Sequence, residues 1–306
     1  MFVKSEGLAL DLYDLLSRLK SFLSAQGWTI NDESVSTLQI QRGSNRFYSL
    51  RAFSNSWPDD PETEFPISGI ALRGATGFDV SGGFSGQPGR PDDDYDMMLL
   101  PYASKYVFLD DGYMCWVATE VAAGFWQHLC FGRVISSWQT ALFGGSLKMS
   151  DGVSSVLNQT NVPLASASNG TTCFVQNEYT GGWAKWFNSD AQVGDLATGH
   201  GLNSSFYGFP NYSLNNSDGI LARARSAFTG ITMLVPIQFY GGQGGKWRYI
   251  GNLQYAFIVN MRELFAERTY TVGSKQYYVL PFGKKPEPFN HNSTPGKGLG
   301  IALRIA

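Results

Sequence analysis

At residues 105–119 the chain reads Lys105-Tyr-Val-Phe-Leu-Asp-Asp-Gly-Tyr-Met-Cys-Trp-Val-Ala-Thr119, and this stretch decides the fold class. Both ends of the stretch are rich in aromatic and β-branched residues, which favour extended strands. The step from Asp111 to Gly112 is typical of the tight turns that join antiparallel strands, because glycine accepts a positive φ. The stretch therefore predicts an antiparallel β-hairpin.

More strand patterns lie on both sides of this hairpin, with apolar and polar residues in alternation and Gly-rich turns between them. They fall at residues 28–30, 36–41, 47–53, 67–72, 126–132, 230–240, 246–251, 256–261, 269–274, 276–282 and 298–305. Strands that follow one another across short turns pair in antiparallel fashion, so we expect antiparallel sheets.

One amphipathic helix is predicted over residues 11–26. Its apolar residues recur at steps of three and four, as a single helical stripe requires: Leu12, Leu15, Leu16, Leu19, Phe22 and Leu23. Asp11 suits the N-cap, and Gly27 suits the left-handed residue that ends a helix. The predicted fold class is therefore mainly β (α+β), with antiparallel sheets in a sandwich or barrel-like arrangement behind one N-terminal amphipathic helix.

The pattern divides the chain into three parts. Residues 1–135 hold the helix and antiparallel strands, and residues 136–221 are predicted to be a loop-rich insertion. Residues 222–306 form a C-terminal β region that we expect to pack with the first part. Residues 74–91 are dense in Gly, Ser and Pro and run into the acidic residues 92–96, which predicts a long exposed loop.

Composition and charge exclude several classes of protein. With 43% hydrophobic residues the chain can bury a large core, and a net charge of −2 leaves no broad cationic surface, so we expect no direct contact with nucleic acid. The three cysteines lack metal or redox spacing and are predicted to stay reduced. We find no signal peptide and no membrane-spanning run, which predicts a protein made in the cytosol.

Catalytic patterns fail when they are tested one by one. His128, His200 and His291 stand apart without metal-ligand spacing, and the apolar neighbours of His128 predict a packed histidine. The run around Ser85 lacks the glycine that a nucleophile elbow needs at Gln87, so its glycines are assigned to a mobile loop. The acidic residues 92–96 lack the pattern of a helix-loop-helix calcium site. We therefore predict no catalytic residue, no cofactor and no metal site, and no enzymatic activity.

Two groups of segments carry a resemblance to a known class of protein. The first is the helix that ends in Gly27-Trp28, followed by strands and by the stretch from Trp116-Val-Ala-Thr119 to Gly132, which includes the aromatic run at residues 125–132. The second is the succession of residues 236–240, 245–251, 259–260, 271–274, 277–282 and 300–304. In this order they resemble virion structural proteins of tailed bacteriophages. The resemblance covers about the first 135 and the last 80 residues, and residues 136–221 depart from it.

This resemblance implies a structural subunit of the tail, baseplate or neck, assembled in the host cytoplasm and retained in the virion. Its implied partners are other phage structural proteins and further copies of itself in a symmetric ring, with no membrane. The candidate interface residues are aromatic side chains in predicted loops, although each is favoured somewhat more as local core: Trp57, Phe84, Trp183, Trp186, Phe206 and Tyr207.

Two alternatives remain open. A host-glycan or receptor-binding tail module is favoured by the run Tyr179-Thr-Gly-Gly-Trp-Ala-Lys-Trp, whose aromatic side chains suit stacking on sugars. An envelope-degrading enzyme ranks third, because no nucleophile, metal set or acid pair survives inspection.

Overall fold

The structure is a computed structural model, and the part of the chain that it describes is mainly β. It covers residues 1–54, 68–90, 98–135, 141–146, 148–149, 166–167, 170–171, 173–176, 183–185, 234–243, 246–261, 264–284 and 299–306. Strands make up 59% of these residues and pair in antiparallel sheets behind one N-terminal helix, which confirms the predicted fold class.

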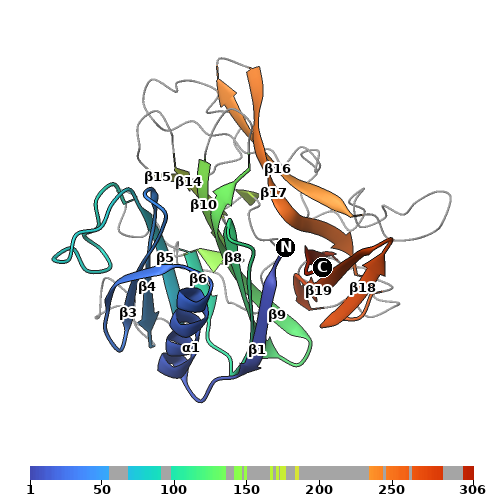
Figure 1. Cartoon of the computed structure of the whole chain (residues 1–306), viewed down its shortest axis with the longest axis horizontal. Coiled ribbons are helices and arrows are strands. Elements are labelled where there is room, and N and C mark those ends of the chain that lie inside the picture. Colours follow the sequence, from blue (N-terminus) through green and yellow to red (C-terminus); the bar gives the residue numbers. More distant parts are fainter. Residues whose placement is uncertain are drawn as a thin grey trace.

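An eight-stranded antiparallel sheet forms the centre of the molecule (Figure 1). Its order is β1 (Val3–Leu8), β7 (Lys105–Asp110), β8 (Met114–Ala122), β9 (Phe125–Val134), β10 (Ala141–Ser146), β14 (Cys173–Gln176) and β15 (Trp183–Lys185), and β20 (Gly283–Lys284) also pairs with β9. The predicted hairpin is β7–β8, and Gly112 has a φ of 87° in its turn. Asp110 is the last residue of β7.

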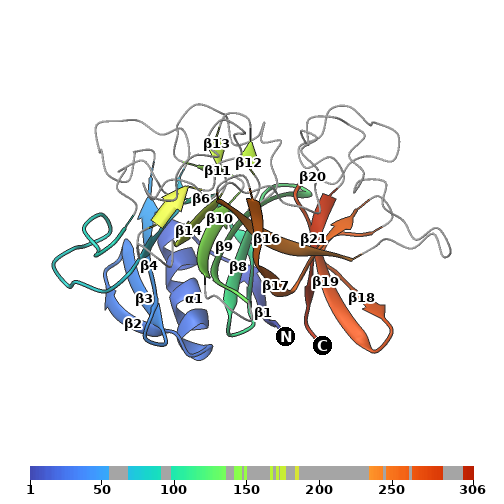
Figure 2. The ribbon, with the colours of Figure 1, turned by 90° about the horizontal axis from the view of Figure 1, so that it is seen from above.

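Two further large sheets flank this one (Figure 2). The six-stranded sheet has the order β11 (Lys148–Met149), β6 (Met98–Pro101), β5 (Gly69–Ala75), β4 (Arg46–Phe53), β3 (Thr37–Arg42) and β2 (Thr29–Glu33). The five-stranded sheet has the order β16 (Val235–Gln243), β17 (Lys246–Asn260), β21 (Leu299–Arg304), β19 (Lys275–Pro281) and β18 (Arg268–Val272). Strands β12 (Ser166–Ala167) and β13 (Gly170–Thr171) pair separately.

Helix α1 (Leu12–Ala25) lies between the six-stranded and eight-stranded sheets (Figure 1). Asp11 caps it as predicted, because its side chain accepts a hydrogen bond of 2.7 Å from the backbone N–H of Asp14. Gly27 follows the helix with a φ of 85°, a conformation that favours glycine. The predicted apolar stripe of the helix is buried along its whole length.

The eight-stranded sheet is central because both of its faces are apolar. Alternate side chains of a strand point to opposite faces. Trp116 and Trp126 contribute to a core shared with the five-stranded sheet, whereas Cys115 and Phe131 contribute to a core shared with α1 and the six-stranded sheet. Residues from the first and last thirds of the chain thus share one hydrophobic core.

The described part of the predicted exposed loop is a loop at residues 76–90, and eight of these fifteen residues are exposed as predicted, although the loop lies against the molecule and buries two side chains. Gly74 and Ala75 belong to β5, and residues 76–90 cover part of the outer face of the six-stranded sheet. Phe84 and Gln87 are each only 4% exposed. The physical reason is that Phe84 packs on side chains of the sheet, whereas the Gln87 amide forms hydrogen bonds to Asp79 and Gly83 within the loop.

Candidate functional site

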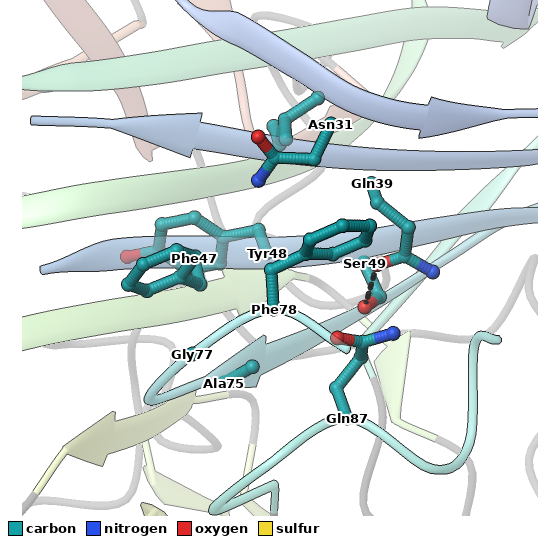
Figure 3. Close-up of a pocket in the computed structure, with 10 residues that line it drawn as sticks. Asn31, Gln39, Phe47, Tyr48, Ser49, Ala75, Gly77, Phe78 and Gln87 are labelled. Atoms are coloured by element: carbon teal, nitrogen blue, oxygen red, sulfur yellow. Dashed lines mark hydrogen bonds between the residues drawn. The ribbon is translucent and has the colours of Figure 1, made fainter. Parts of the chain in front are cut away.

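A shallow hollow lies where residues 76–90 meet the outer face of the six-stranded sheet (Figure 3). Its lining combines amides with aromatic rings, a mixture that also lines carbohydrate sites: Asn31, Gln39, Ile40, Phe47, Tyr48, Ser49, Ala75, Gly77, Phe78 and Gln87. It encloses almost no space that a water-sized sphere could occupy, whereas ligand pockets have volumes of about 300–1,000 Å³. The hollow is therefore too small for a ligand of ordinary size.

The buried amides of this hollow bond to the protein itself. Gln39 donates from Nε2 to the carbonyl of Gly83 over 2.9 Å, and its Oε1 accepts a hydrogen bond from the Ser49 hydroxyl. Gln87 accepts from the backbone N–H of Asp79 over 2.9 Å and donates to the carbonyls of Asp79 and Gly83 over 2.9 and 2.8 Å. Gln39 thus links the loop to the sheet, and Gln87 links two parts of the loop to each other.

The glycines around Ser85 have packing roles. A Cβ placed on Gly82 would lie 2.6 Å from the carbonyl oxygen of Gly86, and the N–H of Gly86 donates to the carbonyl of Gly82 over 2.7 Å. Gly83 has a φ of 53°, which favours glycine. The run that resembled part of a nucleophile elbow is a tight loop closure, and the mobile loop that we predicted there is corrected to a folded one.

A second polar cluster stands at the turn of the β7–β8 hairpin. The carboxylate of Asp110 accepts hydrogen bonds from Trp28 Nε1 over 2.7 Å and from Arg42 Nη1 over 2.9 Å. Burial raises the pKa of Asp110, against the opposing effects of these two donors. Burial also raises the pKa of Asp111 to about 6. The Asp110 carboxylate links the turn to the segment just after α1, since Trp28 lies three residues beyond the end of the helix, whereas Asp111 accepts hydrogen bonds within the turn from the N–H groups of Tyr113 and Met114.

His128 is fully buried between two sheets, as the sequence predicted. Its Nδ1 accepts a hydrogen bond of 2.9 Å from Trp116 Nε1, and its Nε2 donates over 2.7 Å to the carbonyl of Pro281. Burial lowers the pKa of His128 to about 4, so the ring is neutral at pH 7. Through these two hydrogen bonds, His128 of β9 connects Trp116 of β8 to Pro281 of β19. Within the residues described, no three His, Cys, Asp or Glu side chains are grouped to hold a metal ion.

The remaining candidate surfaces are strand edges with exposed side chains. β18 lies at one edge of the five-stranded sheet, and four of its five residues are exposed. β1 lies at one edge of the eight-stranded sheet, with Val3 and Leu8 50% and 67% exposed. Leu10, just before α1, is 87% exposed. Sheet edges and exposed apolar side chains suit contacts with other protein chains.

The structure describes only part of the predicted interface set. Phe84 lies in a small core with Phe53, Ala71 and Leu99, so it is packed locally and is not an exposed anchor. The backbone of Trp183 belongs to β15 and pairs with Gln176. Trp57, Trp186, Phe206 and Tyr207 lie outside the described residues.

Sequence reasoning did not predict that strand β18 is exposed and available for contacts with other chains. Its sequence, Arg268-Thr-Tyr-Thr-Val272, has the β-branched and aromatic residues of a half-buried strand. The signal that points to exposure is the polar pair of residues Thr269 and Thr271 on one side of the strand, with a charged residue at its start.

No helix in the described part of the chain has both the length and the apolar character of a membrane span.

Comparisons with known proteins identify no family for the chain. No protein-family model matches the chain, and no curated protein has significant sequence similarity to it.

Proposed function

We propose that this chain is a structural subunit of a tailed-bacteriophage particle. In the tail, baseplate or neck it docks on neighbouring virion subunits, with several copies arranged in a symmetric ring. The observation that carries the proposal is the order of segments quoted above. These segments coincide with α1 and Trp28, with β8 and β9, and with β16 to β21.

The architecture supports an assembly role in two ways. First, the eight-stranded sheet is covered on both faces, which makes the molecule a rigid scaffold. Secondly, β1 and β18 are strand edges that carry exposed side chains. A rigid body with open strand edges is suited to fixed contacts with neighbouring subunits, since an edge adds a strand without rearrangement of its own sheet.

The copy number of the chain in intact particles tests this proposal. Purified particles are analysed by quantitative mass spectrometry against a capsid protein of known copy number, and the mass of the free chain is measured in solution. We expect a fixed number of copies per particle, such as three, six or twelve, because ring symmetry fixes the copy number. Absence of the chain from purified particles would overturn the proposal.

A host-glycan-binding module is the alternative function. Its candidate run at residues 179–186 is described only for the backbone of Trp183–Lys185. In the hollow of Figure 3, the buried amides of Gln39 and Gln87 bond within the protein. No specific contact among the described residues favours sugar binding over assembly, and a glycan array distinguishes the two functions.

A further inference from the structure

Strand β18 has an open edge on the side of the molecule away from β2 and β3 (Figure 2). Among the described strands its sole neighbour is β19, and the register of the pair runs from Arg268 opposite Val279 to Val272 opposite Lys275 without a shift. The edge strands β2 and β16 are irregular, since β2 has a register shift next to Asn31 and β16 has two shifts, whereas the edge strand β1 is regular like β18. Bulges protect edges from pairing, and β18 lacks that protection over its five residues.

The backbone groups of Thr269 and Thr271 point toward this open edge. In a hairpin with a two-residue turn, the residues that flank the turn bond to each other, and bonded and non-bonded pairs then alternate. Val272 and Lys275 flank the turn, so the pair of Thr271 and Gln276 is a non-bonded one. Gln276 agrees with this, because its N–H and its carbonyl both bond to residues 305–306, on the opposite side of β19.

We propose that a second copy of this chain pairs with this edge, β18 to β18, in antiparallel orientation about a two-fold axis at Tyr270. The sequence of β18 reads nearly the same in both directions around that residue: Arg-Thr-Tyr-Thr-Val. In the register centred on Tyr270, each Thr269 faces Thr271 of the other copy, and Tyr270 faces Tyr270. Threonine pairs and aromatic pairs are favourable cross-strand neighbours.

The directions of the backbone groups agree with this register. Thr269 and Thr271 both present their N–H and C=O to the edge, and the register places them opposite each other, so the two copies exchange four hydrogen bonds. If the register between the two copies were shifted by one residue, the N–H and C=O groups that face the edge would lie opposite backbone groups of the other copy that already bond to β19. The five-stranded sheet would then continue through the two-fold axis into the sheet of the second copy.

The charges of the strand select the same arrangement. Arg268 is the one charged residue of β18, and the centred register places it opposite uncharged Val272 of the other copy. Parallel, in-register pairing would set Arg268 directly opposite Arg268, which is unfavourable. Exposed apolar side chains lie beside the edge, with Val272 48% and Phe265 67% exposed. The edge is thus compatible in charge and sequence with a copy of itself.

This inference concerns the free chain, so it stands or falls independently of the particle. The test is sedimentation equilibrium of the full chain from about 1 to 500 μM. We expect a reversible monomer–dimer equilibrium. A chain that stays monomeric over the whole range would overturn the proposal, whereas its copy number in particles would be unaffected.

Two substitutions at one exposed position predict opposite effects. Val272→Lys sets a lysine opposite Arg268 of the other copy and is expected to raise the dissociation constant about tenfold. Val272→Glu sets a carboxylate there and is expected to lower it by a similar factor. The double variant Arg268→Glu with Val272→Lys restores opposite charges and should return the constant to within about threefold of the parent value. Shifts of the same sign for Val272→Lys and Val272→Glu would overturn the register.

Cysteine cross-linking tests the position of the two-fold axis. In the centred register, residue 270 faces its own copy at a Cα distance of about 4.5 Å, within the range for a disulfide. Tyr270→Cys is therefore expected to give a covalent dimer on mild oxidation, beyond the amount that the parent protein gives. Thr269→Cys is the matched control, because it faces Thr271 and should not cross-link. Equal cross-linking by the two variants would contradict the axis.

Discussion

The hairpins β7–β8 and β18–β19 have similar local sequences and opposite surroundings. Each joins two strands rich in aromatic and β-branched residues, and each has a glycine with positive φ in its turn, Gly112 at 87° and Gly273 at 63°. Yet all of β8 from Met114 to Thr119 is buried, whereas four of the five residues of β18 are exposed. Local sequence thus specifies the hairpin, and the neighbouring layers decide its burial.

The difference teaches where the stability of this fold lies. The first hairpin has a layer on each face and strands β1 and β9 on its two sides. In the second, β18 has a neighbour on one side only among the described strands. Side-chain deletions should therefore be costly in β8 and nearly neutral in β18.

The largest effect is expected from Trp116→Ala in β8. This change removes a fully buried indole and leaves His128 Nδ1 without its donor, so the free energy of unfolding should fall by about 3–5 kcal/mol. Urea unfolding followed by circular dichroism measures it. Tyr270→Ala in β18 is the matched aromatic deletion, with an expected loss of about 1 kcal/mol or less. Equal losses for the two variants would break the comparison.

A pH-dependent effect is expected at the turn of the first hairpin. The pKa of Asp111 is about 6 in the folded chain and 3.8 ordinarily, so the folded state binds more protons between these values. Its stabilising contribution is therefore present at low pH and is lost as the pH rises through 6. Asp111→Asn removes this titration and keeps an oxygen for the N–H groups of Tyr113 and Met114.

Relative to the parent protein, the Asp111→Asn variant should gain about 2–3 kcal/mol in free energy of unfolding between about pH 4 and pH 7. Urea titrations at several pH values measure the difference. His128, with a folded pKa of about 4, contributes with the opposite sign, since its contribution is lost as the pH falls toward 4. The comparison with the parent is therefore essential, and identical pH dependence in the two proteins would contradict the prediction.

A moderate effect is expected where residues 76–90 meet the six-stranded sheet. Gln87→Ala removes the side chain that bonds to Asp79 and Gly83, and it should lower the free energy of unfolding by about 1–2 kcal/mol. Hydrogen exchange of the loop amides should accelerate more than exchange in β8. Gln87→Glu places a carboxylate against the carbonyl oxygens of Asp79 and Gly83 in a nearly buried site, so it should lower the free energy of unfolding at least as much as Gln87→Ala. Unchanged loop exchange in Gln87→Ala would show that other contacts hold the loop.

The smallest effect is expected from Thr271→Ala in β18. The side chain is exposed and the strand is an edge, so the free energy of unfolding at low protein concentration should change by less than about 0.5 kcal/mol. Thermal unfolding monitored at a concentration below the dimer range measures it. A loss above about 1 kcal/mol would place β18 among the stabilising elements and remove the contrast with β8.

Several elements of this fold could be predicted from sequence because their signals are local. The stripe from Leu12 to Leu23 with Asp11 and Gly27 at its ends predicts α1, and the Asp-Gly step predicts the β7–β8 hairpin. The packed state of His128 also follows from its apolar neighbours. Each of these depends on residues close together in the chain.

The rest could not be predicted because it depends on layers brought together from distant segments. Trp116 and Cys115 are both apolar, and nothing local states that they enter different cores. The composition of residues 76–90 predicts an exposed loop, but it does not show that Gln39 from β3 bonds to the backbone carbonyl of Gly83 or that Phe84 packs on β5. The open edge of β18 depends on which strands lie beside it, and pairing is set by the whole sheet.

The eight-stranded sheet belongs to two cores at once, and this has a consequence for cooperativity. Adjacent residues of β8, such as Trp116 and Val117, point into different cores, so unfolding of this one strand would expose both cores to water. Separation of the five-stranded sheet would expose Trp116, and separation of the six-stranded sheet would expose Val117. The two cores are therefore coupled through one backbone, and the layers behave as a single folding unit.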